Sequence, residues 1–169
     1  MLFRSVQQTP RAFSTMTVLE NVALGAMFGR AGGHRDEEGA LEIARELLSF
    51  VGLEDRSHDN VGSLNLHQQR FLELARAISG RPRLLLLDEV MAGLNDAELD
   101  ASVEMVRTAR DQFGITVIWV EHVMKAVMKL AERIVVLDFG KVLTEGQPEE
   151  VMRDPAVVEA YLGEAIDHA

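Results

Sequence analysis

Two acidic residues, Asp88 and Glu89, directly follow an uninterrupted run of four leucines at residues 84–87. Such a run is typical of a strand that is buried on both faces in the middle of a parallel sheet, and ligands usually bind at the carboxyl end of such a strand. Asp88 and Glu89 are therefore candidate site residues. The same pattern also fits a buried strand whose polar end merely turns into solvent, and the run alone does not decide between the two interpretations.

Composition indicates one domain of ordinary size with a substantial core. The chain has 169 residues, of which 47% are hydrophobic, and this excludes wholesale disorder. Its net charge of -10 argues against a nucleic-acid partner, because electrostatic binding needs clustered Lys and Arg. It has no cysteine, no apolar run long enough to cross a bilayer and no signal-peptide pattern, so we expect a cytoplasmic protein.

Apolar spacing and capping residues predict helices that alternate with strands. After an irregular opening at residues 1–15, the predicted helices cover residues 17–28, 40–51, 64–80, 95–114 and 123–130, with short helical pieces after Pro148 and Pro155. The predicted strands cover residues 84–87, 115–120 and 134–137, the last being a third buried strand with a hairpin partner at 142–144. This alternation predicts an α/β domain with a parallel sheet.

The helix predicted to begin near residue 64 has two different faces. One face is apolar and carries Phe71, Leu74, Ala75 and Ile78. The opposite face is polar and carries Gln68, Gln69, Arg70, Glu73 and Arg76. We expect the apolar face to pack on the core.

The order of these signals resembles the nucleotide-binding subunit of an ATP-binding cassette (ABC) transporter. The signals are Gln8 in a loop, residues 64–68 at a helix start, Asp88-Glu89 after a strand, residues 92–95, and His122 after the next strand. Residues 16–22, 121–124 and 145–163 look like the branched-chain amino acid importers in particular. The resemblance covers essentially the whole chain. It implies a P-loop NTPase-like α/β fold, a parallel sheet core with a helical subdomain.

The resemblance implies a role for each residue that matches a family motif. In the Walker B position, Asp88 would hold Mg²⁺ and Glu89 would act on the water that attacks ATP. Gln8 would reach Mg²⁺ and this water, while its loop touches a membrane permease subunit. His122 would contact the γ-phosphate. Without the resemblance, Gln8 fits an ordinary loop residue and His122 fits a cap or surface residue.

The signature segment and the D-loop are assigned in the same way. The resemblance implies that Leu64, Asn65, Leu66, His67 and Gln68 meet the nucleotide of a second ATPase subunit in a homo- or heterodimer. Asn95 would lie at the dimer interface, a role compatible with its simpler role as a helix cap. The motifs fall into three groups, at residues 1–80, 81–147 and 148–169. The family also implies a place on the cytoplasmic face of the inner membrane.

The sequence departs from the family pattern at two places. No Gly-x-x-x-x-Gly-Lys-Ser/Thr segment is present, so the loop that cradles phosphates is missing and we expect a protein truncated at its N-terminus. The signature reads Leu-Asn-Leu-His-Gln where the family usually has Leu-Ser-Gly-Gly-Gln. His67 adds a side chain where the backbone approaches the nucleotide, so it either supplies a donor or obstructs closure.

Three alternatives stay open from the sequence. Another ABC system, such as lipopolysaccharide export, fits the same motifs because this subunit does not bind the cargo. A non-hydrolysing interaction fragment that pairs with a complete subunit fits the missing phosphate loop. An unrelated doubly wound protein with an acidic ligand site fits only if His122 and Gln8 lie far from Asp88.

Overall fold

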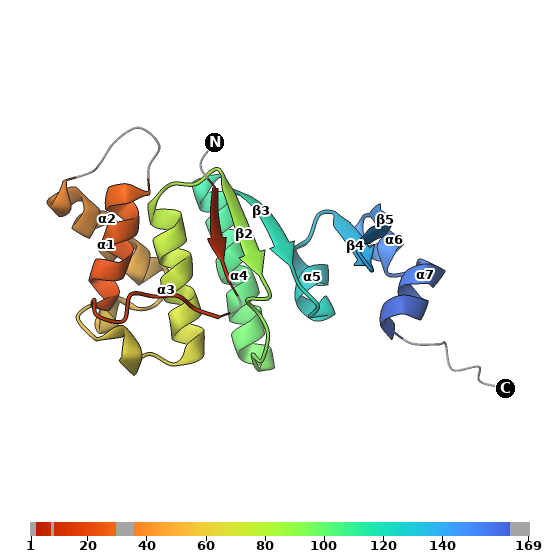
Figure 1. The fold of residues 1–169 in the computed structure, drawn as a ribbon, viewed down its shortest axis with the longest axis horizontal. Coiled ribbons are helices and arrows are strands. Elements are labelled where there is room, and N and C mark those ends of the chain that lie inside the picture. Colours follow the sequence, from red (N-terminus) through yellow and green to blue (C-terminus); the bar gives the residue numbers. More distant parts are fainter. Residues whose placement is uncertain (1–2, 8, 30–35, 163–169) are drawn as a thin grey trace. The chain divides into compact units, whose positions relative to one another are not determined.

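The computed structural model describes residues 3–7, 9–29 and 36–162 (Figure 1). The chain divides into two compact units, Met1–His122 and Val123–Ala169. The grouping of motifs at residues 1–80, 81–147 and 148–169 remains a prediction.

The first unit contains a three-stranded parallel sheet. Its strands are β1 (Phe3–Val6), β2 (Leu84–Asp88) and β3 (Thr116–Val120), in the order β1-β2-β3. The leucine run thus forms the central strand. Because all three strands are parallel, their carboxyl ends lie at one edge of the sheet, which confirms the predicted parallel core.

The prediction of an irregular opening was wrong for β1. Arg4 and Ser5 interrupt its apolar pattern, so neither alternation nor composition indicates a strand. The strand forms because residues 3–6 pair in register with residues 84–87 of β2. Tertiary pairing here overrides a weak local preference.

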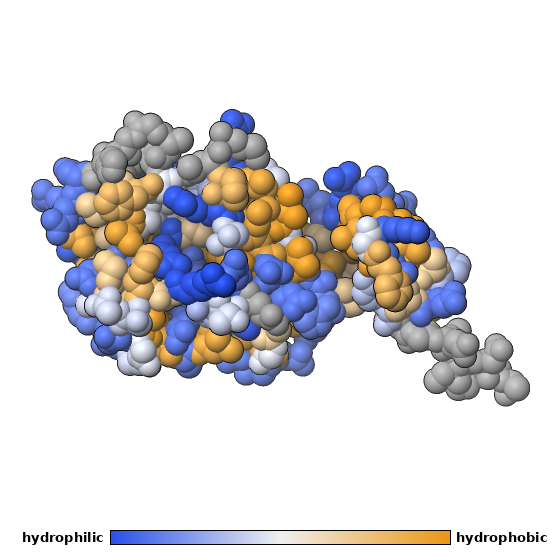
Figure 2. Space-filling view, viewed as in Figure 1, coloured by the Kyte–Doolittle hydropathy of each residue, from blue (hydrophilic) through white to orange (hydrophobic). Residues whose placement is uncertain are grey.

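The two faces of this sheet differ in burial. Val6, Leu85 and Leu87 are at most 2% exposed on one face. On the other face Phe3, Ile118 and Val120 are 60%, 54% and 59% exposed. The prediction that the leucine run is buried on both faces was therefore wrong, since Leu84 and Leu86 are only half-buried. Figure 2 shows hydrophobic residues gathered over these strands; we call Phe3, Leu84, Leu86, Ile118 and Val120 the open sheet face.

Three helices pack on one another beside the sheet. They are α1 (Val18–Phe28), α2 (Glu37–Phe50) and α3 (Leu66–Ser79), and α3 also contacts β1 (Figure 1). As predicted, α1 begins at a capping box formed by Thr17 and Glu20. A methyl group at Gly25 would lie 2.4 Å from Ser79 Oγ and 2.5 Å from the Arg76 carbonyl oxygen, so glycine allows α1 to approach α3 closely.

Two 3₁₀ turns and a long helix complete the first unit. The turns, η1 (Glu54–Arg56) and η2 (Val61–Ser63), connect α2 to α3. Helix α4 (Asp96–Phe113) follows β2 and ends, as predicted, at Gly114, whose φ of 62° lies in the left-handed region that favours glycine. Leu99, Val103 and Val106 form its buried side.

The second unit is a helix, a hairpin and short helical pieces. Its elements are α5 (Met124–Leu130), β4 (Ile134–Asp138), β5 (Lys141–Gly146), α6 (Pro148–Val151), α7 (Pro155–Val157) and η3 (Val158–Leu162). Phe139 and Gly140 both have positive φ, as tight hairpin turns require. Val136, Val151 and Val157 form its core.

The prediction of β4 as a third buried strand was wrong. It pairs antiparallel with β5 in a separate two-stranded sheet, and Val135 and Leu137 are 44% and 55% exposed. The predicted hairpin partner at residues 142–144 is confirmed, since β5 covers them. An apolar run of four residues indicates a strand without indicating how deeply it is buried.

Asn21, buried at 0% exposure, anchors the segment that leads into α1. Its Oδ1 accepts a hydrogen bond from Phe13 N (2.8 Å), and its Nδ2 donates to the carbonyl oxygens of Phe13 (3.1 Å) and Thr17 (2.9 Å). We expect Asn21→Ala to lower the free energy of unfolding by about 2–3 kcal/mol, because buried backbone groups lose their partners. Urea denaturation measures this. Gln112→Ala, at an exposed position, is the control and should change stability by less than about 0.5 kcal/mol.

Candidate functional site

The two predicted carboxylates lie at the edge where the parallel strands end. Asp88 is the last residue of β2 and is exposed, and Glu89 follows it with a φ of 48°. Positive φ is uncommon for a residue with a side chain and is often found at functional sites. The amide N of Glu89 donates to the Val120 carbonyl oxygen (2.9 Å), which fixes Glu89 against the end of β3.

The structure brings Glu89 and His122 together. His122 Nδ1 lies 3.6 Å from Glu89 Oε1, and both side chains are partly open to solvent. They come from adjacent strand ends, 33 residues apart in sequence numbering (122 minus 89). A carboxylate can orient a water molecule, and an imidazole beside it can contact an anionic group. Their nearness is the geometry that the resemblance requires.

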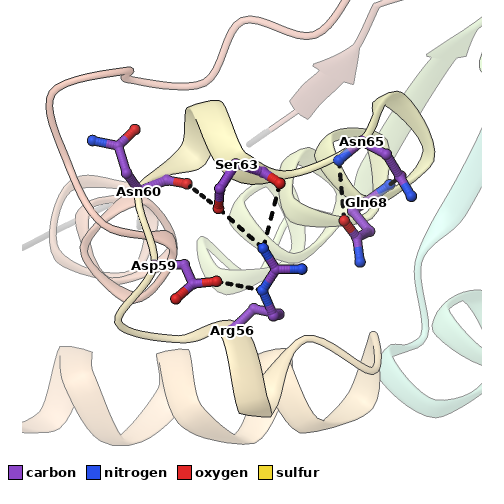
Figure 3. Close-up of polar contacts among 6 residues, drawn as sticks. All are labelled: Arg56, Asp59, Asn60, Ser63, Asn65 and Gln68. Carbon is purple, nitrogen blue, oxygen red and sulfur yellow. Dashed lines mark hydrogen bonds and ion pairs between the residues drawn. The ribbon is translucent and has the colours of Figure 1, made fainter.

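The start of α3 holds the signature segment (Figure 3). Asn65 Oδ1 accepts a hydrogen bond from Gln68 N (2.8 Å), and Gln68 Oε1 accepts one from Asn65 N (3.0 Å). Leu66 is 53% exposed and Leu64 is buried. The exposure of Asn65 and Leu66 puts the positive end of the helix dipole at the surface, while the capping satisfies two backbone N–H groups there.

The loop before α3 is fastened by Arg56 (Figure 3). Its guanidinium pairs with Asp59 and donates to the carbonyl oxygen (3.3 Å) and Oγ (3.0 Å) of Ser63. Ser63 Oγ in turn donates to the carbonyl oxygen of Asn60 (2.8 Å). These contacts hold the turn that leads into Asn65.

His67 turns its ring away from the exposed end of α3. Its Nε2 lies 3.1 Å from Ser102 Oγ on α4, and its ring centroid lies 4.3 Å from that of Phe71. Burial lowers the pKa of His67, Arg70 lowers it further, and Glu98 opposes both. The ring therefore connects α3 to α4 in this structure, an arrangement that neither expectation for His67 anticipated.

Asn95 caps α4, as predicted. Its Oδ1 accepts from Glu98 N and its own N donates to Glu98 Oε2, both at 3.0 Å. Its place at a dimer interface remains a prediction.

Gln8 lies outside the described residues, but the segment that follows it is held by α3. Glu73 Oε1 accepts a hydrogen bond from Arg11 N (2.5 Å), and Arg76 donates to the Arg11 carbonyl oxygen (3.0 Å) and to Glu73 Oε1 (3.1 Å). The guanidinium of Arg76 also lies 5.1 Å from the ring centroid of Phe13. Both backbone polar groups of Arg11 are thus bound by side chains of α3.

The expected division of α3 into an apolar and a polar face was incomplete. Arg70 and Glu73, assigned to the polar face, are only 6% and 5% exposed. Burial raises the pKa of Glu73, while the Arg11 amide and Arg76 lower it. Sequence periodicity could not distinguish a charged helix face that contacts solvent from one that binds loops. The spacing of Arg70, Glu73 and Arg76 at every third residue was the only available signal.

The described residues contain no cluster of three or more His, Cys, Asp or Glu side chains that could hold a metal ion. A cavity between α3, β2 and α4 has a volume of about 20 Å³ and is lined by residues including His67, Leu87 and Ser102. This is room for about one water molecule, far below a nucleotide pocket. Within the described parts of the chain, no helix is both long and apolar enough to cross a membrane.

Comparison with known protein families decides which family the chain is part of. The family model described as ABC transporter matches residues 2–92, which is more than half of the chain. The chain belongs to the ABC transporter family. A second family model, described as branched-chain amino acid ATP-binding cassette transporter, matches residues 141–167.

Two curated relatives carry names from branched-chain amino acid transport. The chain is 38% identical to the high-affinity branched-chain amino acid transport ATP-binding protein BraF of Pseudomonas aeruginosa and 34% identical to LivG of Escherichia coli K12. Each match covers 94% of this chain and 66% of the relative. The chain thus spans slightly less than two thirds of the length of these relatives.

Solved structures confirm the ABC ATPase fold. The ADP conformation of MJ1267, an ATP-binding cassette of an ABC transporter, matches with a TM-score of 0.81 at 28% identity over 96% of this chain and 69% of that one. The ATP-binding cassette MJ0796, solved as a dimer bound to ADP and Pi, matches with a TM-score of 0.75 at 26% identity, over 86% of this chain and 62% of that one.

The lowered pKa of His67 predicts a pH-dependent stability. The neutral imidazole is favoured in the folded protein, so its contribution is present above the ordinary pKa of 6.5 and is lost as the pH falls through the folded value. We expect the stability difference between the wild type and His67→Gln, which cannot titrate, to fall as the pH is lowered from 7.5 to about 5. Denaturant unfolding across this range measures it. His58→Gln, which removes an exposed imidazole, is the control, and an equal pH trend in both variants would contradict the prediction.

Proposed function

We propose that this chain forms part of the ATP-hydrolysing subunit of an ABC importer for branched-chain amino acids. The observation that carries the proposal is the pairing of Glu89 with His122, 3.6 Å apart, at adjacent strand ends in a chain of the ABC family. The importer assignment is supported by the similarity to BraF and LivG and by the second family model at residues 141–167.

The donor chemistry at the strand ends fits ATP with Mg²⁺. Mg²⁺ in nucleotide sites is commonly held by one or two carboxylates together with the phosphates, and Asp88 is an exposed carboxylate placed for this. When bound, the ion offsets charge on the transferring phosphoryl group. In this role Glu89 would orient the attacking water and His122 would contact the γ-phosphate. Gln8 is assigned to the same water and ion by the family resemblance alone, because it lies outside the described residues.

A second subunit completes the site. The exposed start of α3, capped by Asn65 and Gln68, presents backbone N–H groups and a positive dipole end to the nucleotide of the partner. Asn95 lies along the same interface. The dimeric form of MJ0796, a structural relative, supports a homo- or heterodimer.

The phosphate-cradling loop comes from outside these 169 residues. No Gly-x-x-x-x-Gly-Lys-Ser/Thr segment occurs in the sequence, and the relatives are longer than this chain. ATP is therefore bound jointly by this chain and by a loop that it does not contain. Membrane permease subunits bind the Gln8 loop and the helices α1–α3, which places the subunit on the cytoplasmic face of the inner membrane.

The open sheet face favours a second candidate function, that of a non-hydrolysing module pairing with a complete ABC subunit. Three large apolar side chains there are more than half exposed, an arrangement typical of surfaces that bind another protein segment. Lipopolysaccharide export remains an alternative cargo system without specific support. The unrelated doubly wound protein is excluded by the family match.

Glu89→Gln tests the catalytic assignment. We expect this substitution, made in the protein expressed from its native gene, to lower the ATP hydrolysis rate by about 10²-fold or more, because the amide cannot accept the proton of the attacking water. The affinity for ATP should stay unchanged. A coupled phosphate-release assay and equilibrium nucleotide binding measure the two quantities. Glu42→Gln, at an exposed position on α2, is the control. Normal turnover in Glu89→Gln would disprove the role.

The isolated chain of 169 residues should show no measurable affinity for Mg-ATP at millimolar concentration under either candidate function, because no phosphate loop is present. The mass of the native protein separates the two functions. The intact mass of the protein purified from its native source is the companion measurement. A mass above 18.7 kDa, with a peptide containing a glycine-rich Lys-Ser/Thr loop, supports the ATPase subunit, whereas a mass of 18.7 kDa favours the pairing module.

A further inference from the structure

Glu121 is an ionisable residue whose side chain is completely buried, at 0% exposure. It lies between Val120, the end of β3, and His122. Its two carboxylate oxygens accept hydrogen bonds from two different segments: Oε1 from Met91 N at 2.8 Å, and Oε2 from His122 N at 3.0 Å. Met91 comes two residues after Glu89. The Glu121 carboxylate thus connects the loop that follows Asp88 and Glu89 to the backbone of His122.

Arg70 binds the same loop at the next residue. Its Nη1 donates to the Ala92 carbonyl oxygen at 2.8 Å, so residues 91 and 92 are bound by Glu121 and Arg70 respectively. Arg70 belongs to α3 and lies four residues after Leu66, where this helix begins. The loop between Glu89 and Asn95 is therefore hydrogen-bonded both to the residue after β3 and to α3.

The opposite charges of Arg70 and Glu121 interact while both side chains are buried. Arg70 is 6% exposed, and its Nε has no hydrogen-bond partner among the described residues. Burial lowers the pKa of Arg70, and the negative charge of Glu121 opposes this effect. Removing either side chain alone would leave the other as an uncompensated buried charge.

We propose that Glu121 and Arg70 are positioning residues that set the distance between Glu89 and His122 and connect it to α3. Glu121 fixes the loop after Glu89 and the backbone of His122 with one rigid group. Arg70 transmits any displacement of α3 to the same loop. The significance of this geometry for catalysis rests on the proposed function, but the fastening itself does not require a nucleotide.

Amide hydrogen exchange in the ¹⁵N-labelled chain without nucleotide tests the proposal. The Met91 and His122 amides should be protected in the wild type. In Glu121→Ala both should exchange at least about ten-fold faster, because both lose a charged acceptor. Amides inside α2 and α3 should keep their rates. Unprotected amides in the wild type, or unchanged rates at both positions in the variant, would overturn the proposal.

Glu121→Gln keeps the test decisive if the alanine variant does not fold. The amide side chain has one acceptor oxygen, so one of the two backbone N–H groups should lose protection and the other should keep it. The His122 ring ¹⁵N signals should also shift, because the ring moves relative to Glu89. Glu104→Gln removes the same charge at an exposed position on α4 and should change neither. Protection of both amides in Glu121→Gln would contradict the role of the carboxylate.

Arg70 is tested by a pair of substitutions. Arg70→Met removes the donor to Ala92 and should speed exchange at Met91, whereas Arg70→Lys keeps the charge and should preserve more of the protection. Equal exchange in the wild type and both variants would remove Arg70 from the proposal. Because these measurements need no ATP, absence of ATP hydrolysis by the protein expressed from its native gene would reject the proposed function without affecting this result.

Discussion

Parallel pairing of β2 with both β1 and β3 is the constraint on which the candidate site depends. In-register pairing places Val6, Leu87 and Trp119 side by side, so the three chains leave the sheet at one edge. Gln7, the Asp88-Glu89 pair and His122 all lie within two residues of a strand end at that edge. No single local feature of these segments would bring them together, and the sheet alone does so.

Helix α3 is the second organising element: its apolar side packs on the core, and its charged side chains hold the loops. Its start presents Asn65 and Gln68, and its buried polar residues hold two loops: Arg70 binds the loop after Glu89, and Glu73 with Arg76 binds the Arg11 peptide. Buried charges contribute little net stability because desolvation opposes their attraction. Their value here lies in fixing the geometry of loops that lack an apolar core of their own.

Much of the fold could be predicted because its signals are local. The capping boxes at Thr17 and Asn95, the stop at Gly114 and the leucine strand each depend on residues close in sequence. The strand β1 could not, because its pairing with β2 determines it, and neither could the exposure of β4, although its hairpin partner was predicted. Asp88, Glu89 and His122 were indicated by their places after strands. Glu121 and Arg70 were not predicted as residues that position the site, because only the packing around a charged residue buries it and brings it next to the loop that it binds.

The open sheet face has a consequence for how this protein reaches its native state. Phe3, Ile118 and Val120 stand on the outer strands β1 and β3, each of which pairs only with β2 among the described residues, and a strand added at either outer edge would leave this face exposed. Only a layer laid on top of the sheet would cover it. Until that layer arrives, self-association competes with correct assembly, and the yield of native protein should depend on chain concentration and on the order in which the layers meet.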